Sequence, residues 1–249
     1  TKVNKNINTL DTIEIDSLRV RIPFDQVTVI NSDIVDRFGT YNAETGEQLD
    51  EPKPRNWYRV EKQNTVGEKL YSYKWAIEKI TTEKGRANSY LTIQINSKVL
   101  HQHYFKGISL HTIKTVYKQL MAEKVVSFSL DTFLGAECTD IDFKKDVINQ
   151  HFRKAITQLN EMSKPFKQYG KGANPFRDKG NLGIEWSNRR TASPSNPFLK
   201  LYHKGLQCHN HSEMIPFYNK FLKGGSDTVQ SRIRIEYTIK NKKHLKKWG

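Results

Sequence analysis

The chain has 249 residues, enough for one large domain or two small ones with a hydrophobic core. Its 12 Phe, 11 Tyr and 4 Trp exclude an intrinsically disordered chain, and the lack of any apolar run of about 20 residues excludes a membrane-spanning helix. Lysine and arginine outnumber aspartate and glutamate by 41 to 26, so the net charge of +15 favours a polyanionic partner.

The first predicted element is a strand over residues 12–22, in which apolar and polar residues alternate. The alternation shifts by one residue at Asp16 and Ser17, which is the pattern of a β-bulge. A bulge re-aims side chains, so Asp16 either turns inward at this point or is an ordinary acid in solvent. Residues 31–56 are rich in acidic residues, Gly and Pro, and we expect a surface loop or a short solvated helix there.

Three further strands are predicted over residues 57–62, 68–80 and 89–96, the last with clean alternation. After them, His101 and His103 stand two residues apart, a spacing that puts both rings on one face of a strand, where they can bind one divalent ion. Nicking endonucleases carry a similar His-x-His signature with a bulky apolar middle residue, whereas the middle residue here is Gln102. Two histidines that face solvent or form hydrogen bonds remain the alternative.

Two helices and a strand are predicted in the middle of the chain. The first helix covers residues 109–125, with Ser109 as N-cap and an apolar stripe that belongs to the core. A strand over residues 136–146 puts Asp140 and Asp142 on one face, where they either hold a hard divalent cation or face water. The second helix is predicted over residues 146–163.

Residues 164–196 are basic and contain interleaved aromatic residues, a composition typical of a groove for single-stranded nucleic acid. A solvated basic loop is the alternative. The candidate DNA-binding residues in this segment are Lys171, Trp186, Arg189 and Arg190. A strand over residues 183–187 is expected to form a hairpin with the next strand, which would bring the arginines near it.

That next strand covers residues 198–204 and carries Tyr202 between Lys200 and Lys204 on one face. Cations beside a tyrosine can hold a phosphate and favour the phenolate, so Tyr202 is a candidate nucleophile. A surface strand whose tyrosine and lysines face solvent is the alternative. The last predicted strand covers residues 230–240, with four apolar residues on one face and Arg232, Arg234 and Glu236 on the other.

The order of these motifs resembles that of rolling-circle replication initiators of the Rep_trans type and of the gene II-like replication proteins of phages and plasmids. The resemblance covers roughly residues 12–240. Its motifs are Ile15-Asp16-Ser17-Leu18-Arg19-Val20, Thr139-Asp140-Ile141-Asp142 with Asp146, Ser187-Asn188-Arg189-Arg190, Leu201-Tyr202-His203-Lys204-Gly205 and Arg234-Ile235-Glu236-Tyr237.

The resemblance implies a metal-dependent endonuclease that nicks and rejoins one DNA strand at an origin through a 5′-phosphotyrosine intermediate. The family's tyrosine and lysine fall on Tyr202 and Lys204, and its acids, which would bind Mg²⁺ or Mn²⁺, fall on Asp16, Asp142 and Glu236. Two positions depart from the family pattern. Gln207 stands where the family often has Glu, and Asp140, a fourth candidate ligand, stands where it more often has Arg.

We therefore expect an α+β fold with a large, mainly antiparallel sheet flanked by helices, in a single nuclease and origin-binding domain. Two similar halves, about residues 1–130 and 131–249, are an alternative. The DNA-binding candidates in the second half also include Lys200, Arg232 and Arg234. The expected partners are DNA and, through the resemblance, a host helicase and polymerase; no membrane is expected, and an oligomer is allowed.

The expected location is the cytoplasm of a bacterial host cell. The two cysteines form no CxxC pair or disulfide framework, and the first residues lack the apolar core of a signal peptide. Three rival functions remain open: a non-catalytic DNA-binding initiator or repressor, a nickase that uses the two histidines, and an RNA-binding module.

Overall fold

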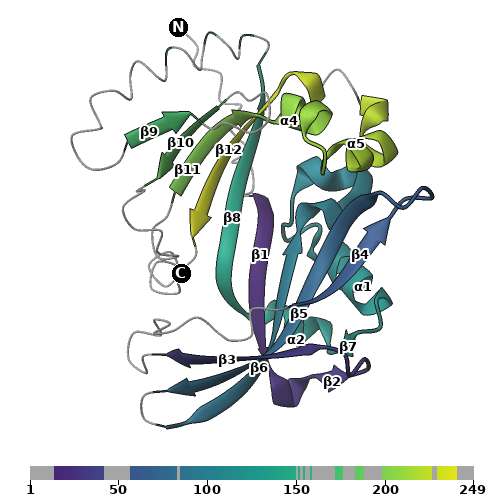
Figure 1. The fold of residues 1–249 in the computed structure, drawn as a ribbon, viewed down its shortest axis with the longest axis vertical. Helices are drawn as coiled ribbons and strands as arrows, with labels where there is room; N and C mark the ends of the chain where they lie inside the picture. Colours follow the sequence, from purple (N-terminus) through teal and green to yellow (C-terminus); the bar gives the residue numbers. More distant parts are fainter. Residues whose placement is uncertain are drawn as a thin grey trace, which may run out of the picture.

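The computed structural model describes residues 14–41, 57–82, 85–149, 151, 154, 158, 172–175, 183–187, 198–225 and 229–239. This part of the chain forms a large, mainly antiparallel sheet of ten strands. Helices flank the sheet (Figure 1). The predicted fold class is confirmed at this level of detail. Among the described residues, no helix is both long and apolar enough to cross a membrane.

The strands run in the order β3-β5-β6-β1-β8-β12-β11-β10-β9 across the sheet, and β4 also pairs with β5. Only β3 and β5 are parallel. The bounds of the strands are β1 (Glu14–Pro23), β3 (Val35–Tyr41), β4 (Tyr58–Gln63), β5 (Lys69–Thr82), β6 (Ala87–Asn96), β8 (Glu137–Ile148), β9 (Gly172–Pro175), β10 (Gly183–Ser187), β11 (Phe198–His203) and β12 (Arg232–Ile239).

The helical elements follow β1, β6 and β11 in the sequence. They are η1 (Phe24–Gln26), η2 (Ser97–Lys106), α1 (Ile113–Ala122), α2 (Leu130–Leu134), α4 (Lys204–Asn210), α5 (Ile215–Phe221) and η4 (Lys223–Gly225). The short strands β2 (Thr28–Val29) and β7 (Val126–Ser127) form a separate two-stranded sheet.

The order of the inner strands is the same on both sides of the central pair, β1 and β8. On each side, the first strand in sequence pairs with the last, β6 or β12, and the last pairs with the strand before it, β5 or β11. The helices differ, because η2, α1 and α2 follow β6 whereas α4 and α5 precede β12. The division into two similar halves therefore stays a prediction.

The main hydrophobic core joins one face of the first half of the sheet to the helices. Its strand residues alternate, as in Leu18, Val20 and Ile22 of β1, and Val116 and Leu120 of α1 pack into the same cluster. The apolar stripe predicted for this helix is thus confirmed. The helix begins at Ile113, later than expected, and Thr112 occupies the N-cap position.

The bulge predicted near Asp16 is confirmed. The register between β1 and β8 shifts between Ile15, which is opposite Phe143, and Ser17, which is opposite Asp142. Asp16 is therefore the extra residue, and it turns towards the side chains of Ser97 and Arg234.

Two predicted boundaries are wrong. Residues 35–41 form β3, parallel to β5, where a loop or helix was expected; Asp36 is held by Lys79 at 2.7 Å, and residues 42–56 lie outside the described part. Residues 146–148 are not the start of a helix, because β8 continues through Ile148 opposite β12. This second difference places Asp146 in the sheet.

Candidate functional site

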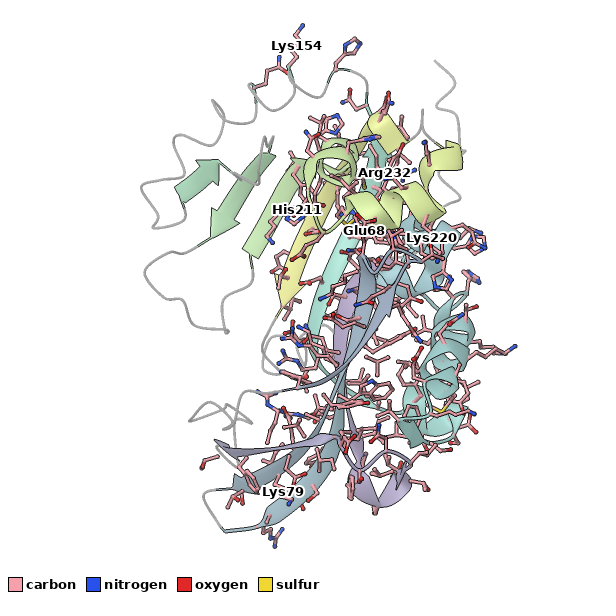
Figure 2. The ribbon with its side chains drawn as sticks, turned by 45° about the vertical axis from the view of Figure 1, so that its right-hand side comes forward. Glu68, Lys79, Lys154, His211, Lys220 and Arg232 are labelled. Carbon is pink, nitrogen blue, oxygen red and sulfur yellow. The ribbon has the colours of Figure 1, made fainter. Side chains whose placement is uncertain are left out.

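The site is built on the polar face of β8, β11 and β12, which is turned towards the interior. Arg234, Asp146 and Tyr202 lie opposite one another on these three neighbouring strands. Arg234 is fully buried and Glu236 is 9% exposed, whereas Ile235, on the other face, is 38% exposed. In this part of the sheet the polar face is thus the more protected one. The region lies at the end of the molecule marked by Arg232 and His211 in Figure 2, opposite Lys79.

Tyr202 is the centre of the site. Its hydroxyl donates to Oε1 of Glu236 at 2.5 Å and accepts from Nζ of Lys204 at 3.3 Å. The side chain is almost completely buried, and this burial, together with the charge of Glu236, raises the pKa of Tyr202 well above its usual value. Lys204 also donates to Oε1 of Gln207, at 2.6 Å. In this arrangement Tyr202 is a protonated phenol with an acceptor and a cation beside it.

Arg234 joins several acids and a second tyrosine. Its guanidinium forms a two-pronged pair with Asp146, at 2.7 and 2.9 Å, and donates to Asp16 at 2.8 Å and to the hydroxyl of Tyr104 at 2.9 Å. The nearer oxygen of Glu236 is 3.7 Å away. A fully buried guanidinium with these partners is a satisfied internal charge. Arg234 is thus engaged inside the protein, and its predicted contact with DNA stays a prediction.

Asp16 reaches this cluster through the bulge of β1. Ser97 Oγ donates to the same carboxylate oxygen as Arg234, at 2.6 Å. Burial by itself would raise the pKa of Asp16, but the charges of Arg234, Lys204 and Lys144 outweigh it and hold that pKa well below the usual range. Asp16 is thus an ionised carboxylate locked to a cation.

Four residues of the cluster were given no role from the sequence: Ser97, Tyr104, Lys144 and Asp146, the last although it belongs to a motif of the resemblance. The side chain of Lys144 is fully buried, and its ammonium contacts Glu14 and Asp146, both at 3.1 Å, and the carbonyl of Phe105 at 2.7 Å. The signal for Asp146 was its even spacing from Asp140 and Asp142 on one strand, which the predicted helix obscured. Ser97 and Tyr104 follow β6, and no pattern in the sequence links them to the site.

A pocket of about 290 Å³ lies against the cluster. Asp16, Tyr104, Lys204 and Gln207 line one side, and residues from β6, η2 and the segment after α4 line the other. Tyr202 is not among the residues that line the pocket; its hydroxyl accepts a hydrogen bond from Lys204, which does line it. A ligand in the pocket would therefore meet the lysine before the tyrosine.

The predicted acids do not form a ligand set for Mg²⁺ or Mn²⁺ as they stand. Asp142 fits such a role, since its Oδ1 atom is buried without a hydrogen-bond partner. Asp16, however, is held by Arg234 and Ser97, and Glu236 by Tyr202, while Asp140 pairs with Arg19 at 3.7 Å. Within the described ranges, no three His, Cys, Asp or Glu residues come together as a metal site. The predicted ion stays a prediction, and no step below depends on it.

The other predicted DNA-binding residues have mixed positions. Arg232 stacks on the ring of Phe105 at 4.0 Å and lies 3.6 Å from Asp146, so its charge is already engaged. Lys200 lies opposite Glu236 in the sheet. Trp186 is in β10, opposite Leu199, and its side chain is not described; Lys171, Arg189 and Arg190 lie outside the described residues. The predicted hairpin of β10 and β11 is confirmed.

The histidine pair is not on a strand. Both residues belong to η2, where His101 has a φ of +54° that breaks the helix. The ring of His101 contacts the hydroxyl of Tyr71 at 2.6 Å and stacks on Phe221 at 4.6 Å, while His103 is exposed. The expected shared face of a strand is therefore wrong, and the pair does not reach Tyr202 through any described contact.

Asp142 leads to a prediction about pH. Burial, with the charges of Glu236, Asp140 and Asp16, raises its pKa to about 6, against about 3.9 in an unfolded chain. The folded protein therefore holds the proton more tightly, and ionising Asp142 costs stability as the pH rises from about 4 to 6. We expect Asp142→Asn to raise the free energy of unfolding at pH 7.5 by about 1–3 kcal/mol and to leave it unchanged at pH 3.5.

Urea unfolding at the two pH values, in the presence of EDTA, measures this effect. Asp36→Asn is the matched control, because it removes a partly exposed carboxylate paired with Lys79, away from Asp142, and should destabilise slightly at pH 7.5. A loss of stability in Asp142→Asn at pH 7.5 that equals its loss at pH 3.5 would contradict the prediction.

Comparisons with protein-family models, curated proteins and solved structures found no match to this chain. The chemistry of the cluster is therefore the guide to function. It offers a phenol with a carboxylate acceptor, a lysine that can neutralise an oxyanion, and a rigid frame of buried ion pairs around them. These are the parts needed for attack by a tyrosine on an anionic, electrophilic group.

Proposed function

We propose that this protein is a rolling-circle replication initiator that nicks one DNA strand at an origin through Tyr202 and later rejoins it. The observation that carries the proposal is the hydrogen bond between the hydroxyl of Tyr202 and Glu236, with Lys204 beside it at the wall of a pocket. The order of sequence motifs and the net charge of +15 support the same conclusion.

The proposed reaction uses Glu236 as the general base. As the oxygen of Tyr202 attacks the scissile phosphorus, its proton passes to Oε1 of Glu236, 2.5 Å away. The bond between phosphorus and the 3′ oxygen breaks, and the electron pair remains on that oxygen, which takes a proton from water. The products are a 5′-phosphotyrosine and a free 3′ hydroxyl. Lys204 neutralises charge on the phenolate and the phosphate.

Because Tyr202 is buried, a DNA phosphate must first change the contacts of Lys204 before it can reach the tyrosine. A phosphate that enters the pocket meets Lys204, which is held by Gln207 at 2.6 Å. The phosphate offers Lys204 a stronger, charged acceptor than the neutral amide oxygen, so binding should draw the lysine from Gln207. The tyrosine would then be within reach of the phosphorus. Gln207 thus acts as a resting partner, at a position where the replication initiators that the sequence resembles often have Glu.

The second candidate is a non-catalytic DNA-binding initiator or repressor. It is favoured by the burial of Tyr202 and by a pKa raised well above the usual value, since both are typical of a structural tyrosine. Under this alternative, the Tyr202, Glu236 and Arg234 cluster only stabilises the sheet. The two candidates differ in whether a covalent protein–DNA adduct forms.

The test is an adduct assay. The protein is incubated with Mg²⁺ or Mn²⁺ and a pool of 3′-labelled single-stranded oligonucleotides, because the strand left on the tyrosine is the one that carries the 3′ end. A labelled band that survives denaturing electrophoresis is expected. Its absence with every oligonucleotide, in a protein that still binds DNA, would support the non-catalytic alternative.

Glu236→Gln tests the base. We expect adduct formation to slow by about 10²–10⁴-fold with little change in DNA binding, because the amide cannot take the proton. The difference in the rate of adduct formation between Glu236→Gln and the unsubstituted protein should become smaller as the pH is raised. The reason is that removal of the carboxylate charge lowers the pKa of Tyr202.

Rescue of Glu236→Gln by additional Mg²⁺, with no effect of pH, would instead identify Glu236 as a metal ligand. Glu68→Gln, in the exposed turn before β5, is the control variant and should react at the normal rate.

A further inference from the structure

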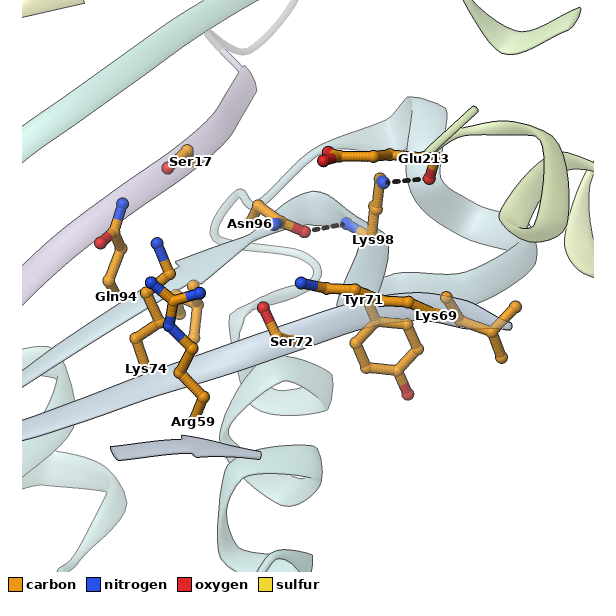
Figure 3. A pocket seen from close by; sticks show the side chains of 12 residues that line it. Ser17, Arg59, Lys69, Tyr71, Ser72, Lys74, Gln94, Asn96, Lys98 and Glu213 are labelled. Atoms are coloured by element: carbon orange, nitrogen blue, oxygen red, sulfur yellow. Dashed lines mark hydrogen bonds between the residues drawn. The ribbon is translucent and has the colours of Figure 1, made fainter. Parts of the chain in front are cut away.

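A second pocket of about 290 Å³ continues from the one beside Tyr202 into the first half of the sheet. Ser17, Asn96, Lys98 and Glu213 line both pockets, so the two form one groove. Figure 3 shows the second pocket, with Lys98 donating to the carbonyl of Glu213 at 3.3 Å. The groove therefore crosses from strands β4 and β5 to the start of α4.

Four cations line this groove without a carboxylate partner: Arg59, Lys74, Lys98 and Lys204. Among the described residues, none of them forms an ion pair. The other end of the same face differs, because Arg21 and Arg37 there share Glu78 at 2.8 and 3.2 Å. The cations at that end of the face are thus compensated by a carboxylate, whereas those in the groove are not.

The cations also crowd one another. Burial and the charges of Arg59, Arg19 and Lys69 lower the pKa of Lys74. Burial and Lys204 lower the pKa of Lys98 to about 8, although Glu213 and Asp16 act in the opposite direction. Like charges held this close repel one another, and a bound anion removes that cost.

The groove has too few acidic residues to balance the charge of its cations. Asp16 is already held by Arg234 and Ser97, and Glu213 is exposed at the edge. Neutral side chains complete the lining and supply hydrogen bonds for a polar ligand; they are Ser17, Ser72, Gln94 and Asn96. This series of cations and neutral polar side chains fits a nucleic-acid strand, in which phosphates alternate with other polar groups.

We propose that the groove holds a single DNA strand on its way to Tyr202, with one phosphate at Arg59 and Lys74 and another between Lys98 and Lys204. This inference rests on the proposed function and extends it to the first half of the molecule. Each pocket has the size of a site for one small ligand, which suits one nucleotide of a strand and is too small for a duplex. Lys98 is the residue that joins the two positions.

The test measures binding without cleavage. The parent protein carries Tyr202→Phe, and its affinity for a fluorescent single-stranded oligothymidylate is measured by anisotropy over a range of salt concentrations. Lys98→Gln and Lys74→Gln should each weaken binding about tenfold, the loss expected for one charge-assisted hydrogen bond. Each should also reduce the slope of log affinity against log salt by about 0.7, because one phosphate contact is lost.

Lys118→Gln is the matched control. Lys118 is an exposed lysine of α1, away from the residues that line the groove, and its removal should leave affinity and salt slope unchanged. Equal affinities of all three glutamine variants would overturn the proposed role of the groove, even if the protein with Tyr202 intact forms an adduct. Tighter binding of a duplex of the same length would overturn it too. Groove binding without an adduct would refute only the nicking function.

Discussion

Replacing Tyr202 with phenylalanine is expected to abolish the covalent protein–DNA adduct while the protein still binds a single strand. The ring keeps its place in the sheet, and only the oxygen that attacks phosphorus is lost. Because the hydroxyl donates to buried Glu236, its removal should also cost about 1–3 kcal/mol of folding free energy. Denaturing electrophoresis measures the adduct, and urea unfolding measures the stability.

Tyr237→Phe is the matched control for this experiment. Tyr237 is on the same strand as Glu236 but points to the opposite face, so its variant should form the adduct at the normal rate. Undiminished adduct in Tyr202→Phe would remove Tyr202 as the nucleophile. If another tyrosine variant lost the adduct instead, the attacking residue would be that tyrosine.

Replacing Arg234 with methionine is expected to destabilise the protein by about 3–5 kcal/mol, because it leaves Asp16 without its ion-pair partner and removes the two-pronged partner of buried Asp146, which keeps only Lys144 and Arg232. The loss should be largest at neutral pH. Both carboxyl groups have pKa values held below the usual range, so the stability that they contribute is present above pH 4 and is lost as the pH falls through their folded pKa values. Urea unfolding at pH 7.5 and pH 3.5 measures the difference.

Arg19→Met is the control, since the pair of Arg19 with Asp140 is 3.7 Å long and partly exposed, and its loss should cost about 0–1 kcal/mol. Adding Asp16→Asn to Arg234→Met should restore part of the stability by removing one unpaired charge. Equal costs for Arg234→Met and Arg19→Met would show that the buried network is not a major source of stability.

The strands and the bulge at Asp16 could be predicted from the sequence because they depend on local alternation. A period of two identifies β1, β5, β6, β8 and β12, and a single break in that period located the bulge. The hairpin of β10 and β11 followed from a turn-rich segment between two short apolar runs. Tyr202, Lys204 and Glu236 were named as candidates, and the fold places them in contact.

The roles of the charged residues could not be predicted in the same way. Alternation shows that Arg234 and Glu236 share a face, but it does not show which face is buried. That depends on η2, which brings Tyr104 and Ser97 against the cluster from the other half of the sheet. Arg234 was therefore assigned to DNA although it forms the internal frame. Asp146 was named in a motif but was given no role, because the helix was predicted to begin there.

The position of β12 within the sheet determines when the site can form during protein synthesis. This strand lies between β8 and β11. The hydrogen bond from Arg234 to Asp16 joins residues that are 218 positions apart in the sequence. A ribosome adds about 5–20 residues per second, so Tyr202 is synthesised seconds before Glu236, which accepts its hydrogen bond. Until β12 has been made, Tyr202 lacks Glu236, which accepts its hydrogen bond, and Arg234, which lies opposite it in the sheet. Under the proposed function, a nascent chain or one cut short before β12 would have no nuclease activity.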